Sequence, residues 1–223
     1  MIARSTMAFI YSKLVPQIPS SLARYHIGPE SNFFISGSYR PRTNSEASDD
    51  RSLKDEWQRE VYEFAHKVAY GREVKTVCDF GCGSGYKLMQ HLKAFRTVGI
   101  EIQPALDFLN ATYPDREWMY SDFKTIPSFP VDLFISSDAI QELPNPDLLI
   151  EYIRKIGPRL VVLSTTDRLL MGRKFYGGPP RNPAHVREWT FREFRAYISY
   201  HFTIERHFIS NHRQGTQCVL CRP

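Results

Sequence analysis

The chain has 223 residues, of which 42% are hydrophobic and 24% are charged, and its formal net charge at pH 7 is +5. This composition is typical of a folded globular protein with a sizeable core, and it excludes wholesale disorder. The longest aliphatic run, residues 160–163, is far shorter than the roughly 20 residues that a membrane-spanning helix requires. We therefore expect a soluble, cytoplasmic protein whose mild positive charge solvates its surface.

The first 51 residues differ from the rest in composition. Residues 1–29 contain basic but no acidic residues, and Pro16 and Pro19 interrupt their apolar positions, which favours an arm over a targeting segment. Residues 38–51 concentrate Ser, Pro, Asn, Asp and Arg, as mobile linkers do. The sequence thus predicts an arm and linker over residues 1–51 and one folded domain over residues 52–223.

The predicted elements of the domain begin with a helix. Ser52 to Asp55 has the form of a capping box, and apolar residues then recur at helical spacing from Trp57 to Ala69. After Gly71, short apolar strands alternate with helices, which predicts a parallel sheet covered on both faces. The expected strands are 76–80, 97–100, 118–120, 133–136 and 160–164, with a helix after Asn145-Pro146.

The C-terminal part has another pattern. A capping box at Thr190 to Glu193 predicts a helix, and the strand-like runs 202–209 and 217–221 follow it as an antiparallel hairpin. The fold class is therefore α/β, with a mostly parallel seven-stranded sheet closed by this hairpin. Cys218 and Cys221 would point to opposite faces of a strand, so we expect no metal site there.

The most informative stretch is a strand that runs into three glycines and then a helix. Gly81, Gly83 and Gly85 permit a tight turn and let a ligand lie against bare backbone, while the helix N-terminus supplies unpaired N–H groups. The spacing G-x-G-x-G lacks the last glycine of the dinucleotide fingerprint, and Asp79 would repel a pyrophosphate, which makes NAD the weaker alternative. Glu101, at the end of the next strand, is placed to bind ribose hydroxyls. These features favour S-adenosylmethionine.

These residues resemble the class I S-adenosylmethionine-dependent methyltransferases over about residues 57–221. The resemblance implies a Rossmann-like fold, S-adenosylmethionine as cofactor and no metal. It also implies a cofactor-binding set in which Glu101 holds the ribose and Ile102 lines the adenine pocket. The other members of the set in the first motif are Asp79, Gly81, Cys82 and Gly83.

Two further motifs are weaker. Residues 121–123 resemble the family's third motif, in which Asp122 would meet the adenine amino group beside Phe123. Residues 132–143 resemble the fourth motif, which contributes Ser137 to the cofactor site and Asp138 as a candidate catalytic group. Many relatives carry Glu-His where this chain has Gln141-Glu142.

The segment 177–190 resembles a loop of methyltransferases from bacterial glycan or secondary-metabolite pathways. Because ligands sit beyond the carboxyl ends of parallel strands, this loop should overhang the methyl group. His185 is the first candidate for a general base, since a neutral imidazole can accept a hydroxyl proton, and Glu142 and Asp138 are its rivals. The candidates for binding the acceptor are Arg187 and, if the arm folds over the site, Tyr25 and Arg40.

The sequence therefore predicts a methyltransferase that acts on an oxygen, less readily a nitrogen, of a small-molecule or sugar acceptor. A nucleic-acid methyltransferase is the main alternative, although the fourth motif lacks the Asn/Asp-Pro-Pro-aromatic signature that grips a base amine in related families. An NAD-binding oxidoreductase and a non-catalytic partner protein with the same fold are further alternatives. We expect no membrane span.

Overall fold

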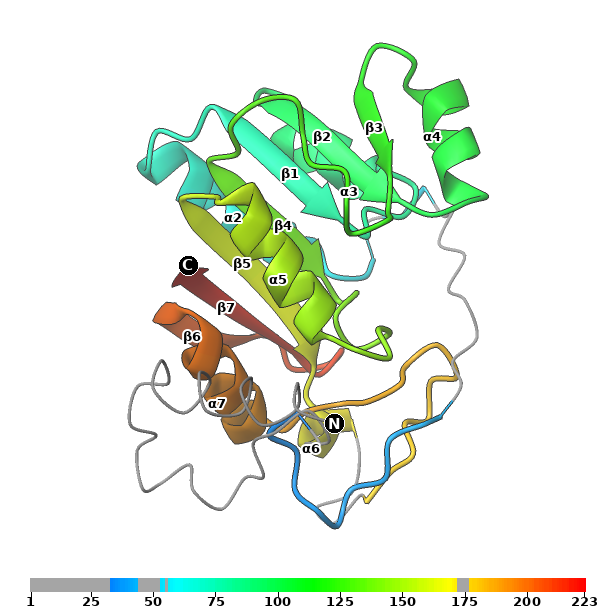
Figure 1. Ribbon diagram of the computed structural model, residues 1–223, viewed down its shortest axis with the longest axis vertical. Helices are drawn as coiled ribbons and strands as arrows, with labels where there is room; N and C mark the ends of the chain where they lie inside the picture. Colours follow the sequence, from blue (N-terminus) through cyan, green and yellow to red (C-terminus); the bar gives the residue numbers. More distant parts are fainter. Residues whose placement is uncertain (1–32, 44–52, 55, 172–176) are drawn as a thin grey trace, which may run out of the picture.

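Seven strands form one sheet in the computed structural model, which describes residues 33–43, 53–54, 56–171 and 177–223 (Figure 1). Their order is β3-β2-β1-β4-β5-β7-β6. The first five strands pair in parallel, and β7 lies antiparallel between β5 and β6. This confirms the predicted sheet and its closing hairpin. The strands are β1 (Thr76–Phe80), β2 (Arg96–Glu101), β3 (Glu117–Tyr120), β4 (Leu133–Ser137), β5 (Leu160–Thr166), β6 (Thr203–Asn211) and β7 (Thr216–Arg222).

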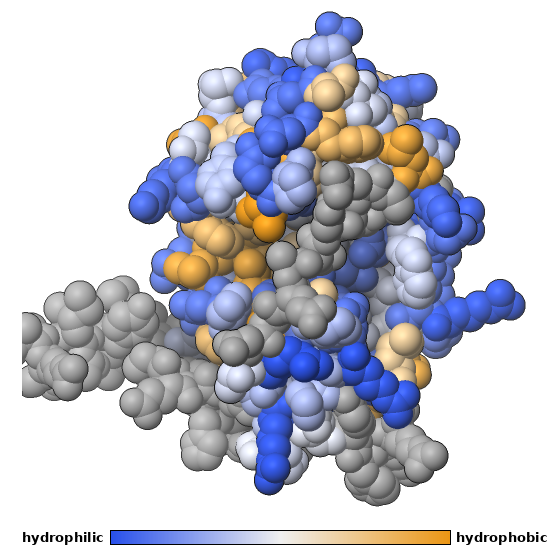
Figure 2. Space-filling view, turned by 90° about the vertical axis from the view of Figure 1, so that its right-hand side faces the viewer, coloured by the Kyte–Doolittle hydropathy of each residue, from blue (hydrophilic) through white to orange (hydrophobic). Residues whose placement is uncertain are grey.

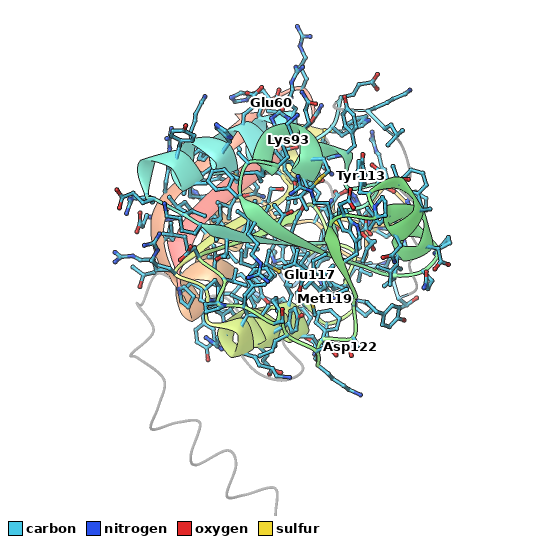
Figure 3. The ribbon with its side chains drawn as sticks, turned by 90° about the horizontal axis from the view of Figure 1, so that it is seen from above. Glu60, Lys93, Tyr113, Glu117, Met119 and Asp122 are labelled. Atoms are coloured by element: carbon cyan, nitrogen blue, oxygen red, sulfur yellow. The ribbon has the colours of Figure 1, made fainter. Side chains whose placement is uncertain are left out.

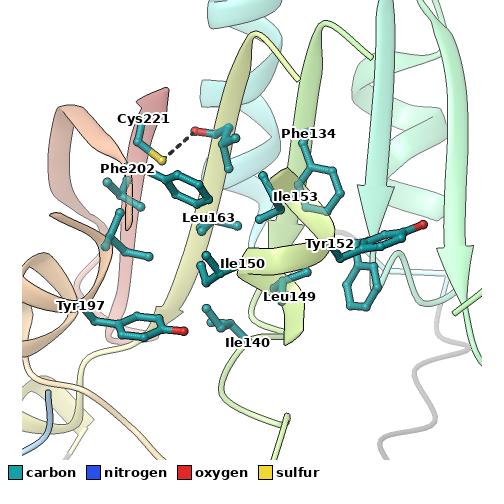
Figure 4. Close-up of a cluster of buried hydrophobic side chains, with 14 of the residues drawn as sticks. Phe134, Ile140, Leu149, Ile150, Tyr152, Ile153, Leu163, Tyr197, Phe202 and Cys221 are labelled. Carbon is teal, nitrogen blue, oxygen red and sulfur yellow. Dashed lines mark hydrogen bonds between the residues drawn. The ribbon is translucent and has the colours of Figure 1, made fainter. Parts of the chain in front are cut away.

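Helices cover both faces of the sheet, and each face has its own apolar core. The helices are α2 (Arg59–Gly71), α3 (Tyr86–Leu92), α4 (Ala105–Thr112), α5 (Asp147–Ile156), α6 (Arg168–Met171) and α7 (Phe191–His201). One core joins α2 and α3 to the sheet, and the other joins α5 and α7 to the opposite face. In the second core, Leu149, Ile150 and Ile153 of α5 pack among strand and α7 side chains (Figure 4). Each such fully buried side chain contributes about 1.5–3 kcal/mol.

The ends of α5 and α7 follow from local sequence. The Asn145 side chain accepts the N–H of Asp147 at 3.0 Å, and α5 stops at Gly157, whose φ of +67° suits glycine. At the start of α7, Thr190 accepts the N–H of Glu193, and the Glu193 carboxylate accepts the N–H of Thr190. This reciprocal pair confirms the capping box predicted there.

The start of α2 differs from the prediction. Ser52 and Asp55, the ends of the expected capping box, lie outside the described residues, and α2 begins only at Arg59. Trp57 precedes the helix and is 58% exposed, so it is not part of the buried helical face. Gln58 has a φ of +61°, and this left-handed residue turns the chain into the helix.

Residues 33–43 also depart from the expectation that the packed core begins after residue 51. Phe34, Ile35 and Tyr39 are buried in the same core as α5 and α7. The N–H of Ser36 donates to Glu193 at 2.8 Å, and the Trp189 indole donates to the carbonyl of Phe33 at 2.9 Å. The segment is therefore an integral layer over the C-terminal part of the domain rather than a linker.

The two cysteines of β7 lie in different cores, Cys218 on the α2 side and Cys221 on the α5 side, as expected for residues on opposite faces of a strand. Among the described residues, no helix is long and apolar enough to cross a membrane.

Candidate active site

The turn after β1 needs glycine for steric reasons. Gly81 and Gly85 have φ values of +72° and +69°, which favour glycine. A Cβ on Gly81 would lie 2.7 Å from the Cβ of Ala139, and one on Gly85 would lie 2.6 Å from Leu109. The turn therefore presents bare backbone beyond the carboxyl end of β1.

The Glu101 side chain, at the end of β2, is hydrogen-bonded to the glycine turn that follows β1. Its Oε2 accepts the N–H of Gly83 at 2.8 Å, and its Oε1 accepts the N–H of Ile102 at 2.8 Å. These two bonds hold the carboxylate beside the glycine turn. The residues that the first motif predicted to act together are thus adjacent in space.

A cavity of about 310 Å³ lies beyond the carboxyl ends of β1, β2 and β4. It is lined by predicted site residues from all three motifs, namely Gly81, Cys82, Gly83, Glu101, Ile102, Phe123, Ser137, Asp138 and Glu142. This is where ligands bind in open α/β sheets. Gln58, Tyr62 and Lys87 also line the cavity, and the sequence motifs did not indicate them. Figure 2 shows one flank of the molecule, on which hydrophobic and hydrophilic side chains are interspersed.

Asp79 lies directly behind this lining. Its side chain is fully buried on β1, and the Tyr62 hydroxyl donates to its Oδ2 at 2.9 Å. Its Oδ1 has no hydrogen-bond partner in the part of the chain that the structure describes. Burial raises the pKa of Asp79 to about 7, against the lowering effects of the Tyr62 hydrogen bond and of the nearby Lys87 ammonium.

Asp138 follows β4 and faces the cavity. Its φ is +60°, and the Ser164 hydroxyl donates to its Oδ1 at 2.7 Å while Ser137 lies 3.1 Å from the same hydroxyl. Burial raises the pKa of Asp138, although hydrogen bonds from Ser164 and Gln58 and the charge of Lys87 act to lower it. A half-buried carboxyl with a raised pKa is a stronger proton acceptor than a fully exposed one.

Asp122 is not among the residues that line the cavity. Its carboxylate accepts the N–H groups of Lys124 and Thr125 at 2.7 and 2.8 Å, and these hydrogen bonds lower the pKa of Asp122. The side chain thus caps the turn that follows β3 at the sheet edge, where Figure 3 labels it beyond Glu117 and Met119. Its predicted contact with adenine stays a prediction, while the adjacent Ser121 and Phe123 do face the cavity.

His185 is buried in a hydrogen-bond network beside the cavity and is not part of its lining. Gln141 Oε1 accepts bonds from Thr165 and Thr166, so the Gln141 amide donates to His185 Nε2 at 2.8 Å. The Asn182 amide lies 3.0 Å from the same nitrogen, and His185 Nδ1 lies 2.8 Å from a Glu188 oxygen. Both ring nitrogens are therefore engaged. Its role as a base remains a prediction, and this geometry gives it little support.

Arg187 also has a defined position. Its guanidinium donates to the carbonyls of Leu143 and Pro144 at 2.6 and 2.7 Å and lies over the ring of Phe33. Burial lowers the pKa of Arg187 to about 10. Arg187 thus shapes the cavity wall at Leu143 rather than facing the cavity itself.

Of the other two candidates for acceptor binding, the structure describes only Arg40. Arg40 is exposed, and its backbone N–H donates to the carbonyl of Gly177 at 2.8 Å. Tyr25 lies outside the described residues.

The unpredicted lining residues come from helix packing. Tyr62 lies on the buried face of α2, and Lys87 is buried at the start of α3, which packs against α2. The available signal for Lys87 was its position in the first turn of a helix, next to Leu88, which is in the core. Polar groups at positions that a helix buries often mark functional sites.

The site fits a nucleoside-type ligand with a charged end. Gly81 and Gly83 expose backbone to the cavity, and the Glu101 carboxylate is fixed beside that turn. Asp79 offers a buried oxygen with no hydrogen-bond partner among the described residues. Apolar groups, Ile102 and Phe123, lie on the adjoining wall.

Comparison with known proteins agrees with this geometry. A family model described as a methyltransferase domain matches residues 50–208. No curated protein matches the chain. Among solved structures, the methyltransferase domain of bacterial CtHen1 is 19% identical, with 74% of this chain and 99% of that chain covered and a TM-score of 0.55.

Two further solved structures show the same fold. Magnesium protoporphyrin IX methyltransferase from Synechocystis, solved with SAH, is 14% identical over 81% of this chain and 90% of that one, with a TM-score of 0.57. The mitomycin 7-O-methyltransferase MmcR is 16% identical over 74% of this chain and 53% of that one, with a TM-score of 0.53. Since the family model spans more than half of the chain and includes the glycine turn, Glu101 and the cavity, this protein belongs to the methyltransferase-domain family and is an S-adenosylmethionine-dependent enzyme.

Proposed function

We propose that this enzyme transfers the methyl group of S-adenosylmethionine to a hydroxyl oxygen of a small-molecule or sugar acceptor. The cofactor supplies a methyl group on a positively charged sulfur, which is already a good leaving group. The protein then has to bind both partners, exclude water and receive the hydroxyl proton. The observation that carries the proposal is the position of Asp138, a half-buried carboxyl in the cavity wall whose pKa is raised by partial removal from water.

For the cofactor, we assign the backbone at Gly81 and Gly83 to the amino-acid portion and Glu101 to the ribose hydroxyls. Ile102 and Phe123 supply apolar surface for the adenine. Support comes from their common position on the cavity and from the two backbone N–H groups that hold the Glu101 carboxylate in one orientation.

For the proton acceptor, we assign Asp138 in preference to His185. Asp138 lines the cavity, is oriented by Ser164, and has a pKa that burial raises toward the working range of a general base. His185 Nε2 already faces two amide groups, so its lone pair is engaged. Glu142 lines the same cavity and is the second candidate.

For the acceptor, the charges of the cavity favour a neutral group over a phosphate. Asp138 and Glu142 both lie on the wall that follows β4, and like charges in a poorly solvated site repel an anion. This disfavours nucleic acid. The fold itself does not select an acceptor, since the two neighbours named for their substrates act on a magnesium protoporphyrin and on a mitomycin.

The test is methyl transfer from radiolabelled S-adenosylmethionine into a fractionated lysate of the source organism. We expect the label in a low-molecular-weight fraction, as a methyl ether that survives alkaline and nuclease treatment. Label in a nuclease-sensitive fraction would assign the enzyme to nucleic acid instead. With the labelled acceptor in hand, Asp138→Asn should lower turnover by about 10²–10⁴-fold at near wild-type cofactor affinity, whereas His185→Gln should lower it much less.

A further inference from the structure

Gln58 is a cavity residue with an unusual backbone conformation. It stands directly before α2, lines the cavity and has a φ of +61°, in the left-handed region that residues other than glycine rarely adopt. Asp138 lines the same cavity with a φ of +60°. Such conformations persist only where the surrounding structure holds them, and they cluster at functional sites. The contacts that hold Gln58 therefore indicate what it does.

The backbone of Gln58 is held by the turn between β6 and β7. Because β7 runs antiparallel to β5, this turn lies at the carboxyl end of β5, the end of the sheet that carries the cavity (Figure 1). The Gln58 N–H donates to Gln214 Oε1 at 3.2 Å, and the Gln214 amide donates to the carbonyl of Glu56. Gln214 thus fixes the chain where it enters α2.

The turn is itself fixed to its neighbours. Asn211 Oδ1 accepts the N–H of Gln214 at 3.0 Å, and the Asn211 amide donates to Glu60 of α2 at 2.9 Å. On its other side, the carbonyl of Gly215 accepts the N–H of Asp167 at 2.7 Å. The turn is therefore a rigid support for the start of α2.

The side chain of Gln58 reaches Asp138. A hydrogen bond joins the two side chains, and the amide is its donor because an ionised carboxylate can only accept. From β5, the Ser164 hydroxyl donates to Asp138 Oδ1 at 2.7 Å. Ser164 is not among the residues that line the cavity, whereas Gln58 is. Gln58 is therefore the orienting group on the side from which an acceptor approaches Asp138.

Other groups act on Asp138 by charge alone. Lys87 of α3 and His185, in the loop before α7, favour its ionised form electrostatically, and the charge of Asp138 acts in turn on the buried Cys218 thiol of β7. A hydrogen bond depends on direction, so it also sets the orientation of the carboxyl group. The contribution of Gln58 thus differs in kind from that of the surrounding charges.

We propose that Gln58 is a positioning residue that holds Asp138 toward the acceptor hydroxyl, and that Gln214 in turn fixes Gln58. The inference rests on the proposed function. In that reaction the acceptor oxygen bonds the methyl carbon, the electron pair of the broken C–S bond stays on sulfur, and the hydroxyl proton passes to Asp138. The β6–β7 turn thereby serves proton transfer, although Gln214 is not among the residues that line the cavity.

The first measurement needs no acceptor. Asp138 is titrated by NMR in the full chain with carbon-13-labelled aspartate carboxyl groups, and Asp138→Asn identifies its signal. Gln58→Gly removes the side chain and suits the left-handed backbone, while Gln58→Met keeps the chain length without the amide. In both variants the pKa of Asp138 should be higher than in the wild type, because a bond that stabilises its ionised form is lost.

Variants of the turn provide the matched comparison. Gln214→Ala should raise the pKa of Asp138 in the same direction but less, because it loosens Gln58 without removing its amide. Arg213→Ala, at an exposed position of the same turn, should leave the titration unchanged. Affinity for S-adenosylhomocysteine, measured by calorimetry, should stay within about threefold of the wild type in all four variants.

The second measurement is turnover against pH, as methyl transfer from radiolabelled S-adenosylmethionine into the lysate fraction that the wild type labels. Gln58→Gly and Gln58→Met should lose about 10- to 100-fold in turnover on the acid side of the profile, at a near wild-type KM for the cofactor. The acid limb should move to higher pH, because Asp138 then keeps its proton to a higher pH. Arg213→Ala should follow the wild-type profile.

An unchanged Asp138 titration in Gln58→Gly would overturn the inference and leave the proposed function in place. Parallel losses of turnover and cofactor affinity without a shifted pH profile would also overturn it, since Gln58 would then only support the fold. If Gln58→Met does not fold, Gln58→Gly alone decides. An Asp138→Asn protein with wild-type turnover would contradict the proposed proton acceptor, and the inference with it.

Discussion

Replacement of Asp79 by Asn is expected to stabilise the cofactor-free protein at alkaline pH and to weaken cofactor binding. Burial raises the pKa of Asp79 from 3.8 to about 7 in the folded protein. The unfolded chain therefore loses this proton at a lower pH than the folded protein does. The stability that the neutral carboxyl contributes is complete below pH 3.8 and is lost as the pH rises to about 7.

The size of this effect follows from the pKa difference. A difference of about 3 in pKa corresponds to roughly 4 kcal/mol, and the part that falls between pH 5 and pH 7 is roughly 3 kcal/mol. No reduction for solvent screening applies, because Asp79 is fully buried. A typical domain has only about 5–15 kcal/mol of unfolding free energy, so the change is large enough to measure.

The assay is urea denaturation of the wild type and of Asp79→Asn at pH 5 and pH 8 without cofactor. The free energy of unfolding of the variant, relative to the wild type, should rise by about 3 kcal/mol between the two pH values, because Asn does not ionise. Asp115→Asn, at an exposed position, is the control and should show no such rise. An equal difference between variant and wild type at both pH values would refute the reasoning.

Ionisation of Asp79 lowers the stability of the cofactor-free protein, but it should strengthen cofactor binding. An ionised Asp79 behind the cavity lining favours the ammonium of the cofactor's amino-acid end, so the wild type should lose affinity for S-adenosylhomocysteine as the pH falls below about 7, by up to tenfold per pH unit. Asp79→Asn should bind weakly at pH 8 and show a flat profile. If the affinity of the wild type does not vary between pH 5 and pH 8, the charge of Asp79 does not contribute to cofactor binding.

Three further predictions test the site and the N-terminal segment. Glu101→Ala should weaken S-adenosylmethionine and S-adenosylhomocysteine by about 1.5–3 kcal/mol in calorimetry, the worth of charged hydrogen bonds, and an unchanged affinity would remove Glu101 from the ribose site. Phe34→Ala should lower the free energy of unfolding by about 3–5 kcal/mol, since Phe34 is buried against α7; a loss below about 1 kcal/mol would make the segment dispensable. Arg187→Lys should cost about 1–3 kcal/mol in the same denaturation assay, because one ammonium cannot replace the guanidinium that bonds two carbonyls.

The sheet could be predicted from the sequence because its signals are local. Residues 160–163 form an apolar run that is buried on both faces of β5, and such runs are typical of central parallel strands. The glycine turn is equally local, since three glycines and the strand before them are contiguous in the chain. Glu101 followed from the same logic, as the residue that ends the next strand.

The N-terminal segment could not be predicted in this way. Residues 33–43 begin with the apolar run 33–35, which is too short to show a helical or strand period, and their binding partners lie far along the chain, as Ser36 and Glu193 illustrate. Glu193 also pairs with the buried Arg168, so one carboxylate joins α6, α7 and the segment. Contacts between residues so far apart in the sequence produce no helical or strand periodicity in residues 33–43.

The ranking of the candidate proton acceptors also depends on the three-dimensional structure, and the role of His185 as a base stays a prediction. His185 stands in a loop that sequence reasoning places over the cavity, but its ring is enclosed by Gln141, Asn182 and Glu188. From the sequence alone, Asp138 is the weaker candidate because an ordinary carboxyl is a weak base at neutral pH. Only burial changes that ranking, and burial of a residue after a strand depends on the loops that cover it.

Asp79 and Lys87 show how differently two buried polar residues appear in a sequence. Both are removed from water beside the cavity, which costs free energy in the folded protein. Asp79 could be predicted as a site residue because it stands directly before the glycine turn. Lys87 stands after that turn, on α3, and a lysine on a helix is typical of a solvated surface. Only the packing of α3 against α2 buries it, and a single sequence does not show which helices pack together.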